Sequence, residues 1–267
     1  MQISFNTCIN KTTSFNCTKN TQKPHISSGM FEDNLMCTNA IYFRGQLQKP
    51  ETISYTDIPI ITSEAEYDDV LNRLKNDRTW WPGWSHGRAT KFEQGILPYA
   101  GEQDRSVVIN TFMRNGHIVD PRFSESILRD YVRVMDYALK EFDKTYGKYE
   151  GLVYRCGIMD NPPKNYISTS REPEGLTAII NSKDCYHNPF YIIYTKHGHK
   201  IEEMQKKLCS NPMLRREREI ILDPARQYEE ITDITPEMQE LKNNLRLAIR
   251  DDYGYVPELN TIFYREV

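Results

Sequence analysis

Residues 215–222 read RREREIIL, in which three arginines and two glutamates run directly into an apolar triplet. This pattern predicts a strand over 217–222. Side chains alternate across a strand, so Glu217 and Glu219 are expected on the same face. Two interpretations are open for this stretch alone. The charges neutralise one another on a solvated strand end, as in most charge clusters, or the two carboxylates work together in a site.

The chain that leads to this stretch changes its periodicity at Gly147. Beyond that residue, short runs rich in β-branched and aromatic side chains predict strands. They lie at 151–156, 165–170, 190–196, 217–222 and 260–267. A short helix near 176–180 and a longer one over 235–250, which begins with Thr235-Pro236, are expected between them.

Before Gly147 the pattern is helical. Ser63 and Glu66 form a capping box at the start of one helix, and a second helical face ends at Gly116. A long amphipathic helix is expected over 124–146. Helices followed by strands predict an α+β domain with a helical lobe on its N-terminal side.

Length and charge limit the classes of function. The 267 residues suffice for a sizeable core, and a net charge of −3 with a pI near 6.1 gives no global attraction to nucleic acid or to anionic membranes. No apolar run approaches the roughly 20 residues of a membrane helix, so a soluble protein is expected. A monomer is expected as well. The 6 cysteines form no CxxC pair, which indicates reduced thiols in a reducing cytoplasm.

The N-terminal segment differs in composition from the rest. Residues 1–30 contain no Asp or Glu and are rich in Ser, Thr and Asn. Such a stretch buries too little apolar surface to offset its conformational entropy, so a flexible segment over 1–40 and one domain over 41–267 are expected. The segment is either a frayed terminus or the secretion address of a bacterial effector that acts in the host cytoplasm.

Three short stretches carry candidate chemistry: VYRCG (153–157), YISTS (166–170) and EREIIL (217–222). Each lies in or beside an expected strand, so a folded sheet brings them into one cleft. In this order they resemble the mono-ADP-ribosyltransferases of the cholera-toxin-like type, with their Arg, Ser-Thr-Ser and Glu-x-Glu signature. The resemblance covers about 60–265 and includes INTFMRNG (109–116), which is similar to a helix end of that family.

The resemblance implies a split β-sandwich that forms an NAD cleft, with NAD as the co-substrate. Arg155 would hold the phosphate and the nicotinamide ribose, and Ser168 would orient Glu219. Glu219 would stabilise positive charge on the anomeric carbon while nicotinamide leaves, and Glu217 would meet the incoming acceptor. The other residues implied to bind NAD are Cys156, Gly157, Tyr166, Thr169 and Ser170. A role for Tyr166 in the core is the alternative.

The acceptor is expected to be a side chain of a host protein. In the family a Glu-x-Glu pair usually accompanies arginine, because a guanidinium needs a carboxylate to dock against. Effectors that resemble the family and modify a threonine of ubiquitin provide an alternative acceptor. A catalytically silent binding module of the same fold is the rival from another class, and retention of Arg155, Ser168 and Glu219 argues against it.

Some positions depart from the family pattern. Cys156 stands where the family usually has glycine, and 206–216, expected to form the acceptor-recognition loop, lacks its usual aromatic residue. No metal is expected, because Cys185-x-His187 and His197-x-His199 fit no common zinc spacing. The tryptophans at 80, 81 and 84 are expected to pack on the core, with a target-binding patch as the alternative.

Overall fold

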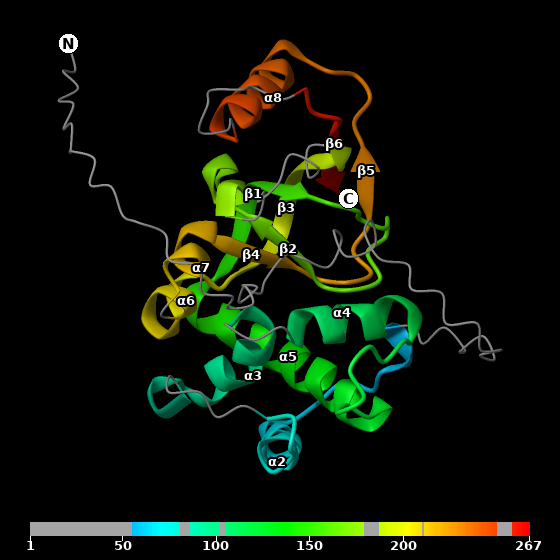
Figure 1. Ribbon diagram of the computed structural model, residues 1–267, viewed down its shortest axis with the longest axis vertical. Coiled ribbons are helices and arrows are strands. Elements are labelled where there is room, and N and C mark those ends of the chain that lie inside the picture. The colour runs from blue at the N-terminus through cyan, green and yellow to red at the C-terminus, as the bar shows by residue number, and fades with distance from the viewer. Residues whose placement is uncertain (1–54, 81–85, 102–104, 179–186, 210, 250–257) are drawn as a thin grey trace, which may run out of the picture.

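The computed structural model describes residues 55–80, 86–101, 105–178, 187–209, 211–249 and 258–267 (Figure 1). The flexible segment predicted over 1–40 lies outside these residues, as do Trp81, Trp84 and Cys185. Trp80 is half-buried, and its ring stacks on Tyr131 with the centroids 6.3 Å apart, as expected for a core residue.

The helical lobe forms one end of the molecule, below the strands in Figure 1. It consists of α2 (Glu64–Lys75), α3 (Lys91–Ala100), α4 (Arg105–Asn115) and α5 (Glu125–Tyr146). The long helix α5 packs against the other three, and its buried stripe includes Tyr131, Met135 and Leu139. Burial of each such side chain stabilises the fold by about 1.5–3 kcal/mol.

The predicted ends of these helices agree with the structure. The Ser63 side chain accepts a hydrogen bond from the Glu66 amide at the start of α2, but the Glu66 carboxylate accepts from the Thr62 amide at 3.1 Å, so only the Ser63 half of the predicted capping box forms. The Ser124 side chain accepts from the Ile127 amide at the start of α5. Gly147 ends α5 with a φ of 69°, a left-handed conformation that favours glycine.

The strands form one mixed sheet in the described part of the chain. They are β1 (Lys148–Cys156), β2 (Ile167–Ser170), β3 (Phe190–Lys200), β4 (Glu219–Leu222), β5 (Tyr228–Glu230) and β6 (Thr261–Glu266). Their order is β1-β2-β4-β3-β6-β5, and β1 also pairs with β3. Because β1 and β4 each pair with both β2 and β3, these four strands close a circuit of hydrogen bonds. The predicted α+β class is confirmed.

The remaining helices surround the sheet. The short helices α6 (Glu202–Leu208) and α7 (Pro212–Glu217) lie beside the start of β4, and α8 (Pro236–Ala248) lies at the end of the molecule opposite the helical lobe (Figure 1). Three 3-10 turns, η1 (Tyr55–Asp57), η2 (His86–Arg88) and η3 (Pro173–Ala178), complete the described elements.

Some elements differ from the sequence-based predictions. The expected loop over 206–216 contains α7 and the end of α6, and the predicted helix near 176–180 is the 3-10 turn η3. Helix α3 was not predicted, because Gly95 and Pro98 interrupt its apolar pattern. Gly95 is needed there, since a Cβ at this position would lie 2.5 Å from the Tyr67 hydroxyl oxygen.

Candidate active site

Strand register brings the predicted motifs together. Strand β2 pairs with β4 so that Ser170 is opposite Glu219 and Ser168 is opposite Ile221. On its other side β2 meets β1, where Ser170 is opposite Tyr154, the residue before Arg155. Arg155, the Ser-Thr-Ser stretch and Glu219 therefore lie on the three neighbouring strands β1, β2 and β4.

The three consecutive hydroxyls of Ser168, Thr169 and Ser170 all contact the segment 217–220. The Ser168 Oγ donates to Glu219 Oε1, and the Thr169 Oγ1 donates to the Ile220 carbonyl oxygen at 2.7 Å. The Ser170 Oγ lies 2.6 Å from the Glu217 carbonyl oxygen. Each residue of this tripeptide thus fixes a different point of the segment 217–220.

Glu219, at the start of β4, is held by two donors. Ser168 donates to Oε1, and the Gln205 Nε2 on α6 donates to Oε2 at 2.6 Å. The side chain is buried, with a relative exposure of 4%. Two donors from different elements fix both the position and the plane of the carboxylate.

The prediction that Glu217 and Glu219 share one strand is wrong. Glu217 is the last residue of α7, and Arg218, with a φ of 47°, turns the chain before β4 begins at Glu219. A helix end followed by a left-handed residue therefore replaces two residues of the expected strand. The Arg218 side chain forms an ion pair with Glu172, while Glu217 is 5% exposed.

The two carboxylates interact electrostatically. Burial and, as the smaller cause, the charge of Glu219 raise the pKa of Glu217 from its ordinary 4.5 to about 8. Burial also raises the pKa of Glu219, to about 7, although the hydrogen bonds from Ser168 and Gln205 act in the opposite direction. The donors to Glu219 favour ionisation of this carboxyl before that of Glu217.

Arg155 is also buried. Its Nη1 donates to the Ser168 carbonyl oxygen at 2.9 Å, and its Nη2 donates to the Ile158 carbonyl oxygen at 3.2 Å. These bonds use two of the five donors of a guanidinium. One of them links the guanidinium to the backbone of Ser168, whose side chain holds Glu219. Next to Arg155, Cys156 is half-buried, and Gly157 has a φ of 112° that favours glycine.

Tyr166 does not line the site. It has no exposed surface, and it packs edge-on against Tyr55 and Tyr99 within the core cluster of the helical lobe. Its carbonyl oxygen accepts from the Tyr99 hydroxyl at 3.2 Å. The alternative role in the core therefore describes Tyr166, and the expected contact with NAD is corrected.

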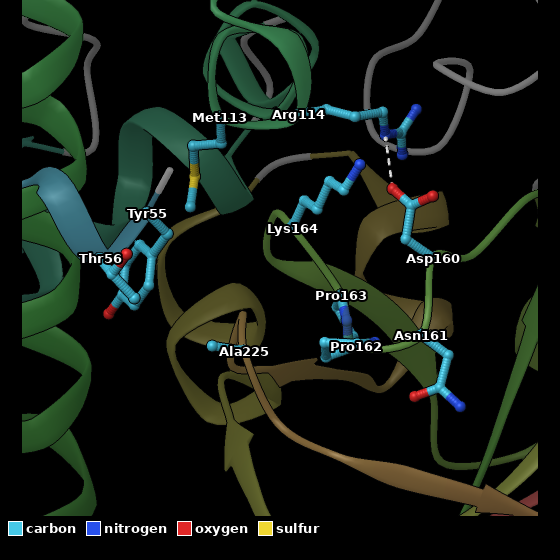
Figure 2. Close-up of a pocket in the computed structure, with 10 residues that line it drawn as sticks. All are labelled: Tyr55, Thr56, Met113, Arg114, Asp160, Asn161, Pro162, Pro163, Lys164 and Ala225. Carbon is cyan, nitrogen blue, oxygen red and sulfur yellow. Dashed lines mark ion pairs between the residues drawn. The ribbon is translucent and has the colours of Figure 1, made fainter. Parts of the chain in front are cut away.

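A cavity of about 620 Å³ lies at the loop 158–164, which joins the strands of Arg155 and Ser168. Figure 2 shows Arg114 and Lys164 on one side of it, with Tyr55 and Met113 across the space. Arg114 Nε is 3.8 Å from a carboxylate oxygen of Asp160. Within the described residues, the exposed Lys164 forms no ion pair.

The arginines before the glutamates differ in their surroundings. Arg215 Nε donates to the Cys209 carbonyl oxygen at 2.7 Å, and Arg218 pairs with Glu172. Arg216 is exposed at the end of α7, directly before Glu217. Of the three, Arg216 is the exposed arginine without a partner in the described part of the chain.

The two histidines of the His-x-His stretch are bound by carboxylates. His197 Nδ1 lies 2.6 Å from Glu266 Oε1. His199 lies between Asp143 and Asp223, at 2.9 and 2.8 Å. In the described residues no group of three or more His, Cys, Asp and Glu side chains is arranged to hold a metal ion.

Gln205 is the site residue that sequence reasoning missed. It lies before the predicted recognition loop and belongs to no motif. Its position four residues after Ile201 on a helix face that also buries Leu208 is a weak signal, because a buried glutamine on such a face needs a polar partner.

No helix in the described residues is both long and apolar enough to cross a membrane.

No protein-family model matches the sequence, and no curated protein matches it significantly. Among solved structures, the Vis toxin, an ADP-ribosyltransferase from Vibrio splendidus, is 15% identical over 78% of this chain and 88% of that chain, with a TM-score of 0.40. HopU1, an ADP-ribosyltransferase of Pseudomonas syringae, is 13% identical over 78% of this chain and 100% of that chain, with a TM-score of 0.43. The eukaryotic mono-ADP-ribosyltransferase ART2.2 is 16% identical over 75% and 74%, with a TM-score of 0.40.

Proposed function

We propose that the protein transfers ADP-ribose from NAD to a side chain of another protein and releases nicotinamide. The observation that carries the proposal is the buried pair Glu217 and Glu219, in which Glu219 is held by Ser168 and Gln205. A fixed carboxylate beside a second one suits a reaction with a developing cation and an incoming nucleophile.

Glu219 is the group for the cation. Cleavage of the bond between the anomeric carbon and nicotinamide leaves positive charge on the ribose, and nicotinamide departs as a neutral molecule. An ionised Glu219 accepts a hydrogen bond from a ribose hydroxyl and stabilises this charge. One preorganised group of this kind contributes about 3–4 kcal/mol to a transition state.

Glu217 is the group for the acceptor. A nucleophilic nitrogen or oxygen bonds to the anomeric carbon as the bond to nicotinamide breaks, and the proton that it loses passes to the Glu217 carboxylate. The turn at Arg218 separates the two glutamates into different elements, which supports separate roles.

Arg155 and the cavity supply positive charge for the diphosphate. The Arg155 guanidinium donates to the Ser168 and Ile158 carbonyl oxygens. Lys164, at the end of the loop 158–164, lines the cavity together with Arg114 of α4. A guanidinium and an ammonium are the side chains that bind phosphate oxygens best. We therefore place the adenosine diphosphate part of NAD toward this cavity.

The acceptor is an arginine of a host protein in this proposal. A buried carboxylate attracts a guanidinium strongly, because water does not screen the pair. A threonine of ubiquitin is the alternative, and the exposed Arg216 beside Glu217 suits an acidic surface on either target. Delivery as a bacterial effector goes with this proposal. One similar structure is that of a type III effector, XopAI from Xanthomonas axonopodis.

Nicotinamide release from NAD by the purified protein tests the reaction. We expect slow release alone and faster release with agmatine, which mimics an arginine side chain. Glu219→Gln should abolish both, whereas Glu217→Gln should keep slow release and lose transfer. Folded wild-type protein that binds NAD but releases no nicotinamide would identify the silent binding module instead.

The acceptor is identified by mass spectrometry of a lysate incubated with the protein and labelled NAD. Modification of arginine in one or a few proteins is the expected result. Modification of a ubiquitin threonine, checked with purified ubiquitin, would select the alternative acceptor.

A further inference from the structure

Gln205 stands out among the buried polar side chains of the protein. It lies on α6, outside the Arg, Ser-Thr-Ser and Glu-x-Glu stretches, and has no exposed surface. Its amide nitrogen contacts Glu219 Oε2 at 2.6 Å and the Ala100 carbonyl oxygen at 3.1 Å. The glutamine therefore joins the carboxylate to the C-terminal end of α3.

The chemistry of these two partners fixes the orientation of the amide. A carboxylate oxygen and a backbone carbonyl oxygen are both acceptors, and only the NH₂ group of glutamine can donate to both. Both hydrogens of Nε2 are used in this way. The amide oxygen is buried, and no donor in the described part of the chain reaches it. Gln205 therefore donates two hydrogen bonds from its amide nitrogen, while its amide oxygen accepts none from the described residues.

Attachment of α6 does not depend on the bond to Glu219. Glu202, at the start of the helix, pairs with Arg171 at 2.8 Å, and Lys207, near its end, pairs with Glu93 of α3 at 2.9 Å. Gln205 itself also reaches Ala100. The donor that faces Glu219 is therefore additional to the contacts that hold the helix in place.

We propose that Gln205 is a positioning residue for Glu219, which holds Oε2 from α6 while Ser168 holds Oε1 from β2. The inference rests on the proposed function, because it assigns the purpose of the contact to Glu219 as the group that stabilises the cation. Two donors on opposite oxygens fix the carboxylate plane and favour the charged form, which is the form the reaction needs. Gln205 acts through Glu219 and needs no contact with NAD.

The pH profile of nicotinamide release tests this role. Gln205→Met keeps the length of the side chain but removes the donor, so the carboxylate loses a bond that favours its charge. We expect the acidic limb of the kcat profile to move to higher pH by about one unit. At pH values below the limb kcat should then fall about tenfold, and at high pH it should fall much less. A residue with only a structural role would lower kcat equally at all pH values.

Two further variants sharpen the comparison. Gln205→Glu keeps the shape of the side chain and adds a charge beside Glu219, so it should move the limb in the same direction and further. Gln94→Met is the matched control, because Gln94 on α3 donates at 3.1 Å to the Ala89 carbonyl oxygen. We expect its limb to coincide with that of the wild type.

A second readout separates this proposal from the proposed function. Carbon-13 NMR of labelled glutamate carboxyls, recorded with and without Gln205→Met, follows the titration of Glu219 directly. Wild-type protein that releases no nicotinamide refutes the proposed function. In that case a higher pKa of Glu219 in Gln205→Met still establishes the contact between Gln205 and Glu219. An active enzyme whose acidic limb and Glu219 titration both stay unchanged in folded Gln205→Met and Gln205→Glu overturns the role of Gln205.

Discussion

The Ser170 hydroxyl oxygen lies 2.6 Å from the carbonyl oxygen of Glu217, 47 residues further along the chain. The first serine of the same tripeptide, Ser168, binds the side chain of Glu219. One short strand therefore positions both carboxylates, through a backbone contact to one and a side-chain contact to the other. This arrangement predicts that the two serines are separable by mutation.

Ser170→Ala should impair transfer more than hydrolysis. Loss of the hydroxyl loosens the end of α7 and with it Glu217, while the donors to Glu219 stay in place. A hydrogen bond of this kind is worth about 1 kcal/mol, so transfer to agmatine should fall about fivefold to tenfold with hydrolysis within about twofold. Initial rates of nicotinamide release, with and without agmatine, provide the measurement.

Two variants serve as references for that experiment. Ser168→Ala should lower both rates together, because it removes a donor from Glu219. Thr177→Ala removes a hydroxyl that bonds to the Glu174 carbonyl oxygen at 2.6 Å within η3 and should change neither rate. Equal losses of both rates in Ser170→Ala would contradict the separate roles of the serines.

The buried carboxylate pair should destabilise the folded protein at alkaline pH. The folded protein holds protons on Glu217 and Glu219 that the unfolded chain releases near pH 4.5, since burial raises both pKa values. The free energy of unfolding should therefore fall as pH rises from about 5 to 8. Glu217→Gln removes one of these acids and should raise the Tm at pH 8 by several degrees, because about 1 kcal/mol corresponds to roughly 2–4 °C.

Thermal unfolding at pH 5 and pH 8 checks this expectation. The gain in Tm should be present at pH 8 and small at pH 5, where the glutamate is protonated in the folded protein. Glu203→Gln, which alters an exposed glutamate on α6, is the control and should show no such pH dependence. A Glu217→Gln variant that is less stable than the wild type at pH 8 would exclude a destabilising role for the pair.

Much of this architecture follows from the sequence because each part has a local cause. Caps at Ser63 and Ser124 and the stop at Gly147 locate helices, and the strand runs of Arg155 and Ser168 are apolar enough to identify. The helix α7 and the turn at Arg218 are not visible in the same way. A left-handed arginine between two glutamates is stabilised by tertiary contacts, such as its ion pair with Glu172.

Long-range partners account for the other gaps. Tyr166 stands beside the Ser-Thr-Ser motif, and only the packing of Tyr55 and Tyr99 shows that its ring belongs to the core. Gln205 is one glutamine among several in the sequence, and its contact with Glu219 depends on how α6 docks against α3. Neither relationship has a periodicity or a spacing that sequence reasoning can detect.

Lys164 should contribute to NAD affinity. It lines the cavity beside Arg114 and forms no ion pair within the described residues, so a phosphate oxygen of NAD is a suitable partner. Lys164→Met should raise the KM for NAD several-fold with little change in kcat, because the contact is made equally in the ground and transition states. The effect should shrink at high salt.

Steady-state kinetics at two salt concentrations measures this effect. Lys75→Met, at the exposed end of α2, removes an equal charge from a different surface and should leave the KM unchanged. A KM that is unchanged in Lys164→Met would place the diphosphate elsewhere and leave Arg155 as the main phosphate contact.

His199 should stabilise the fold in its protonated form. The ring is 1% exposed and lies between Asp143 on α5 and Asp223 after β4, so it ties the helical lobe to the strand of Glu219. Burial alone would lower the pKa of His199, but the hydrogen bonds and charges of Asp143 and Asp223 outweigh it and raise the pKa to about 9. The other charges that face this group are Lys148, 3.9 Å from Asp143, and Arg226, 3.4 Å from Asp223.

The folded-state pKa of His199 lies above its ordinary 6.5, so its contribution is complete below about pH 6.5 and is lost as pH rises through about 9. A difference of this size corresponds to on the order of 3 kcal/mol. His199→Gln should therefore destabilise the protein strongly at pH 6, because it removes the buried cation that lies between Asp143 and Asp223, and only weakly near pH 10. Urea unfolding of both proteins across this range tests the prediction, and the difference between them cancels the contribution of Glu217 and Glu219. A difference that is constant with pH would show that His199 is neutral in the folded protein.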